Sequence, residues 1–166
     1  MNKIITSFLV LVLSFSLMGC SKTTAMTGQY SSSSLKLNQE YTKTFSPSFA
    51  NEAESITKIS IDLYNKGIID KAPEKDTFIS NYEDFDKVVP KNADEKDFQD
   101  SVHKFALYYS MLALDVSILV TEQDLRNRGI ESKDKYDAKM LKYTNSKSGN
   151  IEHIKIDIEN IMKYYK

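Results

Sequence analysis

Few side chains in this chain could carry out chemistry. His103 and His153 are the only two histidines among the 166 residues. Asp100 and His103 are three residues apart, so on a helix they share one face, where they could hold a metal ion or orient an imidazole. A metal site needs further ligands at defined spacings, and no such pattern is present. We therefore interpret the two as a solvated pair and expect neither metal nor cofactor.

Asp115 is a second candidate, because it stands in the middle of the most apolar stretch of the chain, Phe105 to Val120. A buried carboxylate is costly unless it is paired, so Asp115 could contact a ligand, a Lys or a Tyr hydroxyl of another helix. Its helix face also holds Lys104 and Glu122, however, and this favours an exposed edge. Three residues remain candidate contacts for a ligand or a partner: Asp115, Tyr108 and His103.

The motifs of common enzyme classes are missing. The sequence contains no G-x-S-x-G, no P-loop, no H-E-x-x-H and no G-x-G-x-x-G. The single cysteine, Cys20, belongs to the N-terminal pattern considered next, which excludes a Cys/His nucleophile pair. The 22 Lys and Arg and the 23 Asp and Glu are balanced, which argues against nucleic acid as a partner. We expect a protein that is not an enzyme and binds no nucleic acid.

The first twenty residues have the pattern of an exported protein. Lys3 precedes a mostly apolar run, Ile4 to Met18, that is shorter than the roughly 20 residues needed to span a bilayer and suits a secretory signal. The run ends in Leu17-Met18-Gly19-Cys20, which resembles the lipobox of bacterial prolipoproteins. The resemblance covers residues 1–20 only. It implies cleavage between Gly19 and Cys20 and attachment of lipid, including palmitate, to Cys20.

The lipid that this resemblance implies at Cys20 would hold the mature protein on a membrane. Two or more acyl chains give stable anchoring where a single chain does not. In Gram-negative cells the residue after the cysteine helps to sort lipoproteins, and Ser21 resembles the outer-membrane class. We expect the protein at the outer membrane, facing the periplasm. The alternative is a Gram-positive plasma membrane, with the protein on its extracellular face.

Composition divides the chain into a signal peptide (1–19), a lipidated cysteine with tether and arm (20–45) and a folded domain (46–166). Ser21 to Ser34 is polar and rich in Ser, Thr and Gly, which is typical of a flexible tether. Leu35 to Phe45 alternates apolar and polar residues. We favour an extended arm packed on the domain over a mere continuation of the tether.

Two helices are predicted between residues 46 and 90. Ser46-Pro47 is a helix start signal, and Gly67 ends the first helix. Its apolar line is Phe49, Ala53, Ile56, Ser60 and Leu63. Pro73 opens the second helix, with Glu74 and Asp76 in its first turn, and Pro90 closes it. Its line is Phe78, Tyr82, Phe85 and Val89.

A long central helix is predicted from near Asp94 to about Arg128, before Gly129. A seven-residue repeat gives it one stripe: Phe98, Val102, Phe105, Tyr109, Leu112, Val116 and Leu119. A second set widens that stripe: Ala106, Ala113 and Val120. A helix that is apolar nearly all round is covered on several sides. We expect this helix to be the hub of the domain and not a membrane span.

Two shorter helices complete the domain. The first runs from Ser132 to about Thr144 and is followed by a turn, Asn145 to Gly149. Asn150 caps the second, whose apolar face is Ile151, Ile154, Ile158, Ile161 and Tyr165. The predicted fold is all-α, an irregular bundle of about five helices around a long central helix, with a flexible N-terminal tether.

These observations favour a non-enzymatic lipoprotein whose helical domain binds another envelope protein, of an assembly, accessory or exclusion type. Acidic residues gather between Glu74 and Asp100 and basic residues between Arg126 and Lys166, as on a docking surface or on two solvated faces. The alternative function is binding of a small apolar ligand or lipid in the bundle core. A closed cavity beside Phe105–Val120 would favour the ligand, and a solid core with an exposed aromatic patch would favour the partner protein.

Overall fold

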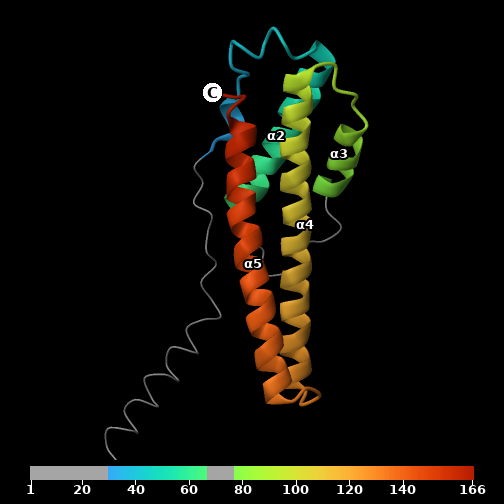
Figure 1. Ribbon diagram of the computed structural model, residues 1–166, viewed down its shortest axis with the longest axis vertical. Coiled ribbons are helices and arrows are strands. Elements are labelled where there is room, and N and C mark those ends of the chain that lie inside the picture. Colours follow the sequence, from blue (N-terminus) through green and yellow to red (C-terminus); the bar gives the residue numbers. More distant parts are fainter. Residues whose placement is uncertain (1–29, 67–76) are drawn as a thin grey trace, which may run out of the picture.

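The computed structural model describes residues 30–66 and 77–166, and this part of the chain is helical (Figure 1). It forms a short 3-10 helix, η1 (Ser32–Ser34), and four α-helices: α2 (Pro47–Lys66), α3 (Thr77–Asp86), α4 (Ala93–Asn127) and α5 (Lys133–Met162). The all-α class is confirmed, but the described part has four α-helices where about five were predicted. Gly19, Cys20 and the tether up to residue 29 lie outside the described residues.

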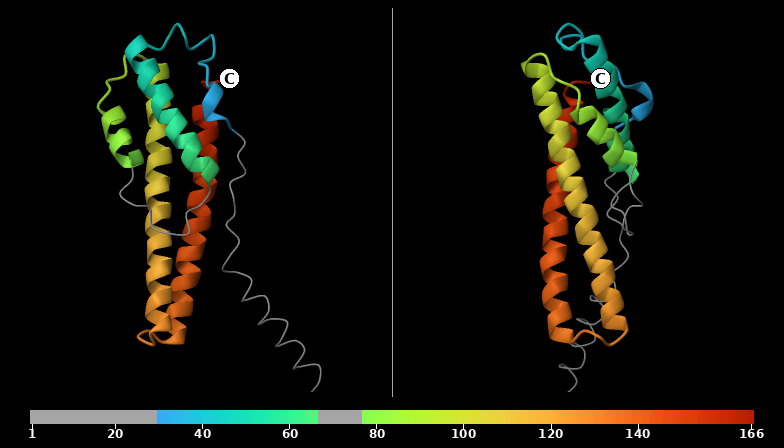
Figure 2. Two further views of the ribbon diagram at one scale, coloured as in Figure 1. Left: turned by 180° about the vertical axis from the view of Figure 1, so that it is seen from behind. Right: turned by 90° about the vertical axis from the view of Figure 1, so that its right-hand side faces the viewer.

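The two longest helices, α4 and α5, run antiparallel and side by side. Figure 2 shows that α2 and α3 pack only against the end of this pair that holds the start of α4 and the end of α5. At the other end, the described part of the chain consists of the α4–α5 hairpin alone. The domain is therefore thick at one end and two helices wide at the other.

α4 begins and ends close to its predicted bounds, and local sequence signals account for both ends, including a cap at Asn92 that was not predicted. The Asn92 side chain accepts a hydrogen bond of 3.0 Å from the backbone N–H of Glu95 and so caps the helix. Asp94 and Glu95 place negative charge in the first turn, where the helix dipole favours it. After the helix, Gly129 has φ 69°, a left-handed conformation that glycine adopts without strain. The chain then reverses into α5.

α5 is a single helix, where two were predicted. The segment from Asn145 to Gly149, interpreted as a turn, is helical, and Ser148 Oγ donates to the carbonyl of Thr144 at 3.0 Å. Asn, Ser and Gly are weak helix formers and cost up to about 1 kcal/mol each. Packing along α4 outweighs that cost, because most helical stability in proteins comes from tertiary contacts of one face.

The hydrophobic core lies at the thick end. The predicted stripe of α4 is buried from Phe98 to Val116, and it packs with apolar residues of α2 and α5: Phe49, Ala53, Ile56, Ile61, Ile154, Ile158 and Ile161. Four rings from different segments contact one another at centroid separations of 5.1 to 6.0 Å: Phe45, Phe49, Phe85 and Phe98. Such tilted and edge-to-face contacts add to the free energy of apolar burial.

α4 is a hub only along its first half. Ala106, Ala113 and Val120 lie on one line of the helix, seven residues apart; the first is buried, the second is half-buried and the third is 52% exposed. Leu119, the last residue of the predicted stripe, is also partly exposed. The expectation of cover on several sides is therefore wrong beyond about Leu112, because α2 and α3 do not extend that far.

α4 also holds the start of α2. The Glu95 side chain accepts two hydrogen bonds of 2.6 Å, from the backbone N–H groups of Ser46 and Lys91. Burial alone would raise the pKa of the Glu95 carboxyl, but these backbone hydrogen bonds outweigh it and hold the pKa below its ordinary value. The residue that secures this helix start is therefore a buried carboxylate from another helix.

α3 matches only part of its prediction. Phe85 is buried and Tyr82 is half-buried, but Val89 lies beyond the end of the helix and is 77% exposed. Its predicted place on the apolar line is wrong, because the helix ends at Asp86. The remaining parts of the prediction lie outside the described residues: Pro73, Glu74, Asp76 and the side chain of Phe78.

The N-terminal arm packs on the domain, as favoured. Leu35 and Phe45 are buried, and Leu37 forms an isolated antiparallel bridge with Tyr165. The backbone N–H of Asn38 donates to the carbonyl of Tyr164 at 2.8 Å. Between these contacts the arm turns repeatedly and is not extended throughout. It ties the start of the domain to the end of α5.

Residues 30–34, which were expected in the tether, contact α2. Asn65 Nδ2 donates to the carbonyl of Tyr30 at 2.8 Å, and Ser32 Oγ donates to Asp62 Oδ1 at 2.8 Å. The packed part of the domain therefore begins at least five residues earlier than composition indicates.

The continuity of α5 can be tested at Gly149. A Cβ atom built there meets no atom within 4 Å. Gly149→Ala should therefore raise the free energy of unfolding by about 0.5–1 kcal/mol, because alanine loses less backbone entropy in a helix. Urea denaturation followed by circular dichroism measures the change. Gly129→Ala is the control: its space is equally open, but φ is +69°, so it should destabilise by roughly 1 kcal/mol. A loss at both positions would contradict a continuous helix.

The two sides of α4 can be compared at neighbouring leucines. Leu112 is 4% exposed, and Leu112→Ala should cost about 2–5 kcal/mol, because lost burial and a residual cavity add. Leu114 is 60% exposed, and Leu114→Ala should change stability by no more than about 0.5 kcal/mol. Thermal and chemical denaturation give both values. Similar losses for the two variants would mean that Leu114 is buried.

Candidate functional site

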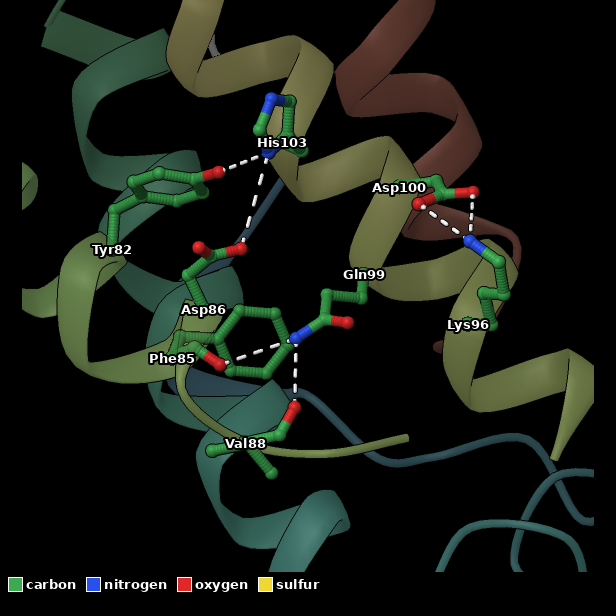
Figure 3. Close-up of polar contacts among 8 residues, drawn as sticks. All are labelled: Tyr82, Phe85, Asp86, Val88, Lys96, Gln99, Asp100 and His103. Carbon is green, nitrogen blue, oxygen red and sulfur yellow. Dashed lines mark hydrogen bonds and ion pairs between the residues drawn. The ribbon is translucent and has the colours of Figure 1, made fainter. Parts of the chain in front are cut away.

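His103, the histidine singled out from the sequence, contacts α3 and not Asp100. Asp100 is paired with Lys96, whose Nζ lies 3.2 Å from the carboxylate. The Nδ1 atom of His103 forms a short hydrogen bond with the Tyr82 hydroxyl and lies 4.0 Å from the Asp86 carboxylate (Figure 3). The expected Asp100–His103 pair is therefore not formed.

The Tyr82–His103 contact fastens one helix to another. Burial raises the pKa of Tyr82 to about 12, and the nearby charge of Asp86 adds to the rise. The phenol thus stays protonated at neutral pH, and which of the two groups donates the hydrogen bond depends on the imidazole tautomer. One turn away, Gln99 Nε2 donates to the carbonyl of Val88 at 2.8 Å (Figure 3). We infer that these two hydrogen bonds hold α3 and the segment after it on α4. They do not activate the Tyr82 hydroxyl as a nucleophile.

The described residues contain no group of three or more His, Cys, Asp or Glu side chains placed to hold a metal ion. The polar clusters that do occur lie at contacts between helices. Asp115 belongs to one of these contacts.

Asp115 is buried, and the favoured exposed edge is wrong. Only 6% of the residue is exposed, and Oδ2 accepts a hydrogen bond of 2.8 Å from Asn150 Nδ2. The error follows from the predicted break in α5. That prediction treated Asn150 as a helix cap, whereas it lies in the middle of a continuous helix and faces α4. The hydrogen bond satisfies a carboxylate that would otherwise be costly to bury.

Asp115 belongs to a line of polar residues along one flank of the α4–α5 contact. Tyr108, Asp115 and Glu122 are seven residues apart and so share one side of α4. The Tyr108 ring stacks on His153 at 4.1 Å and 7°, and Glu122 pairs with Lys139 at 2.9 Å. The α5 partners were missed in the sequence analysis, although the seven-residue spacing on α4 was a usable signal.

Asp157, also missed, lies on the same flank. It is 4% exposed, and its Oδ2 atom has no hydrogen-bond partner among the described residues. Burial raises the pKa of this carboxyl, and the charges of Lys104 and His153 offset part of the rise. A buried carboxylate in this position destabilises the folded protein when it is ionised.

The side of α4 that turns away from α5 carries a second apolar line. Leu107, Met111 and Leu114 are 50%, 42% and 60% exposed, and the line continues through Ile118 and Leu125, which are partly exposed. We define the outer face of α4 as six residues at alternating spacings of four and three: Leu107, Met111, Leu114, Ile118, Thr121 and Leu125. At 1.5 Å per residue it is roughly 27 Å long.

Helix α3 and two basic residues bound this outer face. α3 packs on the same side of α4, because His103, one turn before Leu107, contacts Tyr82 of α3, and Gln99, two turns before it, contacts Val88 just after α3 (Figure 3). Lys104 lies three residues before Leu107, and Arg128 lies three residues after Leu125. The outer face thus begins one turn beyond the contact between His103 and α3, and it ends at the turn between α4 and α5.

Apart from its two basic ends, the outer face is uncharged. Two acidic residues fall between Lys104 and Gln123, and both of them, Asp115 and Glu122, are turned towards α5. The exposed apolar patch is aliphatic, whereas the observation named from the sequence as favouring a partner protein was an exposed aromatic patch. Its neighbours on one flank, Ser110 and Ser117, are short and polar.

Among the described helices, α4 is the one that is long and apolar enough to cross a membrane, and a third of its 18-residue apolar window is buried in the protein. The core helix of a globular domain passes the same test of length and composition. The apolar character of α4 is explained by two lines of apolar residues, one packed against the core and one exposed.

The buried carboxylate of Asp157 can be tested by measuring stability as a function of pH. Burial holds the pKa of Asp157 above its ordinary value of 3.8, so the folded state binds this proton more tightly than the unfolded state. Its contribution to stability therefore falls as pH rises from about 4 through the folded pKa. Asp157→Asn should be more stable than the wild type at pH 7, and the difference should shrink towards pH 4. Exposed Asp134→Asn is the control, and a matching pH dependence there would contradict this assignment.

The outer face of α4 is a continuous row of exposed apolar side chains that packing within the described residues leaves unexplained. Comparisons with protein-family models, with curated proteins and with solved structures find no match to this chain.

Proposed function

We propose that this protein is a lipid-anchored envelope protein whose helical domain binds another envelope protein through the outer face of α4. The observation that carries the proposal is the row of exposed aliphatic side chains from Leu107 to Leu125. Burial of apolar surface contributes a favourable free energy of about 25 cal/mol per Å², and contiguous exposed apolar patches mark interaction sites. Spacings of four and three are also those at which helices pack on one another.

The lipobox supports the anchored part of the proposal. Leu17-Met18-Gly19-Cys20 predicts lipid on Cys20, with the outer membrane favoured over a Gram-positive plasma membrane. Nine residues, or ten Cα-to-Cα steps, separate Cys20 from Tyr30, where the described structure begins, and they span at most roughly 35 Å. An anchor at Cys20 therefore keeps the domain close to a membrane, among envelope proteins.

Packing supports a partner protein over a ligand in the core. Phe105 stacks on Tyr109 with centroids 6.2 Å apart, and Leu112 and Val116 are buried. Beyond Leu112, the described part of the chain has α4 and α5 alone, and two helices do not surround a ligand. The proposal includes no catalytic activity, because the polar clusters are explained by contacts between helices.

Site-specific photocrosslinking in intact cells tests the proposal. A photoreactive amino acid replaces Leu114 on the outer face, or Leu141, which is 65% exposed on α5 and serves as the matched control. We expect one defined protein adduct from position 114 and none from position 141. Leu107→Ser in the same chain should weaken that adduct, because it removes apolar contact next to the crosslinker.

The anchor has its own readout in the same cells. Cys20→Ala should leave an unprocessed precursor without a palmitate label. Equal palmitate labelling of wild type and variant would contradict the lipid assignment. Equal protein adducts from positions 114 and 141 would contradict the docking face, and adducts with phospholipid alone would mean that the outer face lies on the bilayer.

A further inference from the structure

We propose that the partner contributes a helix to the outer face of α4, with an apolar stripe that ends in an acidic residue at each end, and that this partner is not a second copy of the chain. The inference rests on the proposed function and adds the chemistry of the partner. It is carried by the spacing of the outer face and by the two charges that bound it.

The spacing favours a helix. The six positions of the outer face alternate by four and three residues, and a partner helix with the same repeat can place its side chains between them. Ser110 and Ser117, on one flank, are short enough to allow close approach. The outer face also continues an existing helix contact, because α3 packs on the same side of α4 through Gln99 and His103. A partner helix would extend the line that α3 begins.

The two ends favour acidic residues on the partner. Lys104 and Arg128 occupy the next positions of the same repeat, before Leu107 and after Leu125. Both are exposed. Arg128 also pairs with Asp124 at 3.4 Å, but both side chains of that pair are more than 60% exposed, so it competes weakly. The charge of Lys104 also offsets part of the rise in the pKa of Asp157 on α5, and Asp100 and Asp124 lie one turn from the two basic residues. A helix that covers the whole outer face still meets one exposed basic side chain at each end.

The same charges disfavour self-association. In a parallel pair of α4 helices, Lys104 faces Lys104 and Arg128 faces Arg128. In an antiparallel pair with Leu114 opposite Ile118, Lys104 of one chain faces Arg128 of the other at both ends. Either arrangement places two basic residues opposite each other, which costs binding free energy; the neighbouring Asp100 and Asp124 reduce this cost without removing the facing pairs.

A bilayer is disfavoured by the composition of the flanks. Helices that lie on membranes carry an excess of Lys and Arg beside the apolar face, often with Trp or Phe on it. Here Asp100 and Asp124 accompany Lys104 and Arg128, and the six residues of the outer face include no aromatic side chain.

Two synthetic helices of four heptads test the inference. They share the same apolar stripe and differ only in carrying Glu or Lys at its two ends. Fluorescence anisotropy measures their binding to the processed, full-length protein in detergent. We expect the Glu-ended peptide to bind about tenfold more tightly, from two exposed charge pairs. Lys104→Glu with Arg128→Glu should reverse the preference, and Leu114→Ser should weaken both peptides. Circular dichroism checks that every variant is folded.

Three results would overturn the inference. The first is that the two peptides bind with equal affinity or that neither binds. The second is that the charge reversal leaves the preference between them unchanged. The third is that position 114 gives an adduct of homodimer size in cells. A single heterologous adduct at position 114 without a charge preference would leave the proposed function standing and remove only this inference. Absence of any adduct at position 114 would remove the proposed function itself.

Discussion

The antiparallel pairing of α4 with α5 is the constraint on which the rest of the structure depends. The hydrogen bond between Asp115 and Asn150 helps to fix its register, because a shift of one helix along the other would leave the buried Asp115 carboxylate without this partner. The other elements attach to this pair. Glu95 of α4 holds the start of α2, and the arm is hydrogen-bonded to the end of α5 at Tyr164.

Sequence was a good guide wherever the determining interaction is local. Asn92 and Gly129 mark the two ends of α4 through a cap and a left-handed residue, and the seven-residue stripe from Phe98 identifies its buried side. The continuity of α5 was not accessible in this way. The run from Asn145 to Gly149 is unfavourable for a helix on its own, and it is helical only because α4 lies alongside it.

The errors at the candidate site have the same origin. Whether Asp115 is buried depends on a residue of α5 that becomes its neighbour only when that helix is continuous. Tyr108 and His103 were singled out as candidate contacts for a ligand or a partner, and in the structure they contact His153 and Tyr82, which belong to other helices. The outer face of α4 was visible as part of one apolar run. The repeat placed Leu112 on the buried stripe, but the expectation of cover on several sides did not predict that Leu114, on another side of the helix, remains exposed.

Because the domain is thick at one end and two helices wide at the other, small rotations at the thick end produce larger displacements at the thin end. Beyond Leu112, α4 continues for fifteen residues, or roughly 22 Å, with α5 as its described companion. A stalk held at one end amplifies small rotations: a tilt of about 10° at the thick end would displace the tip by roughly 4 Å. Most of the outer face lies on this stalk. A partner bound there would therefore have a long lever arm over the region where the N-terminal arm joins the bundle.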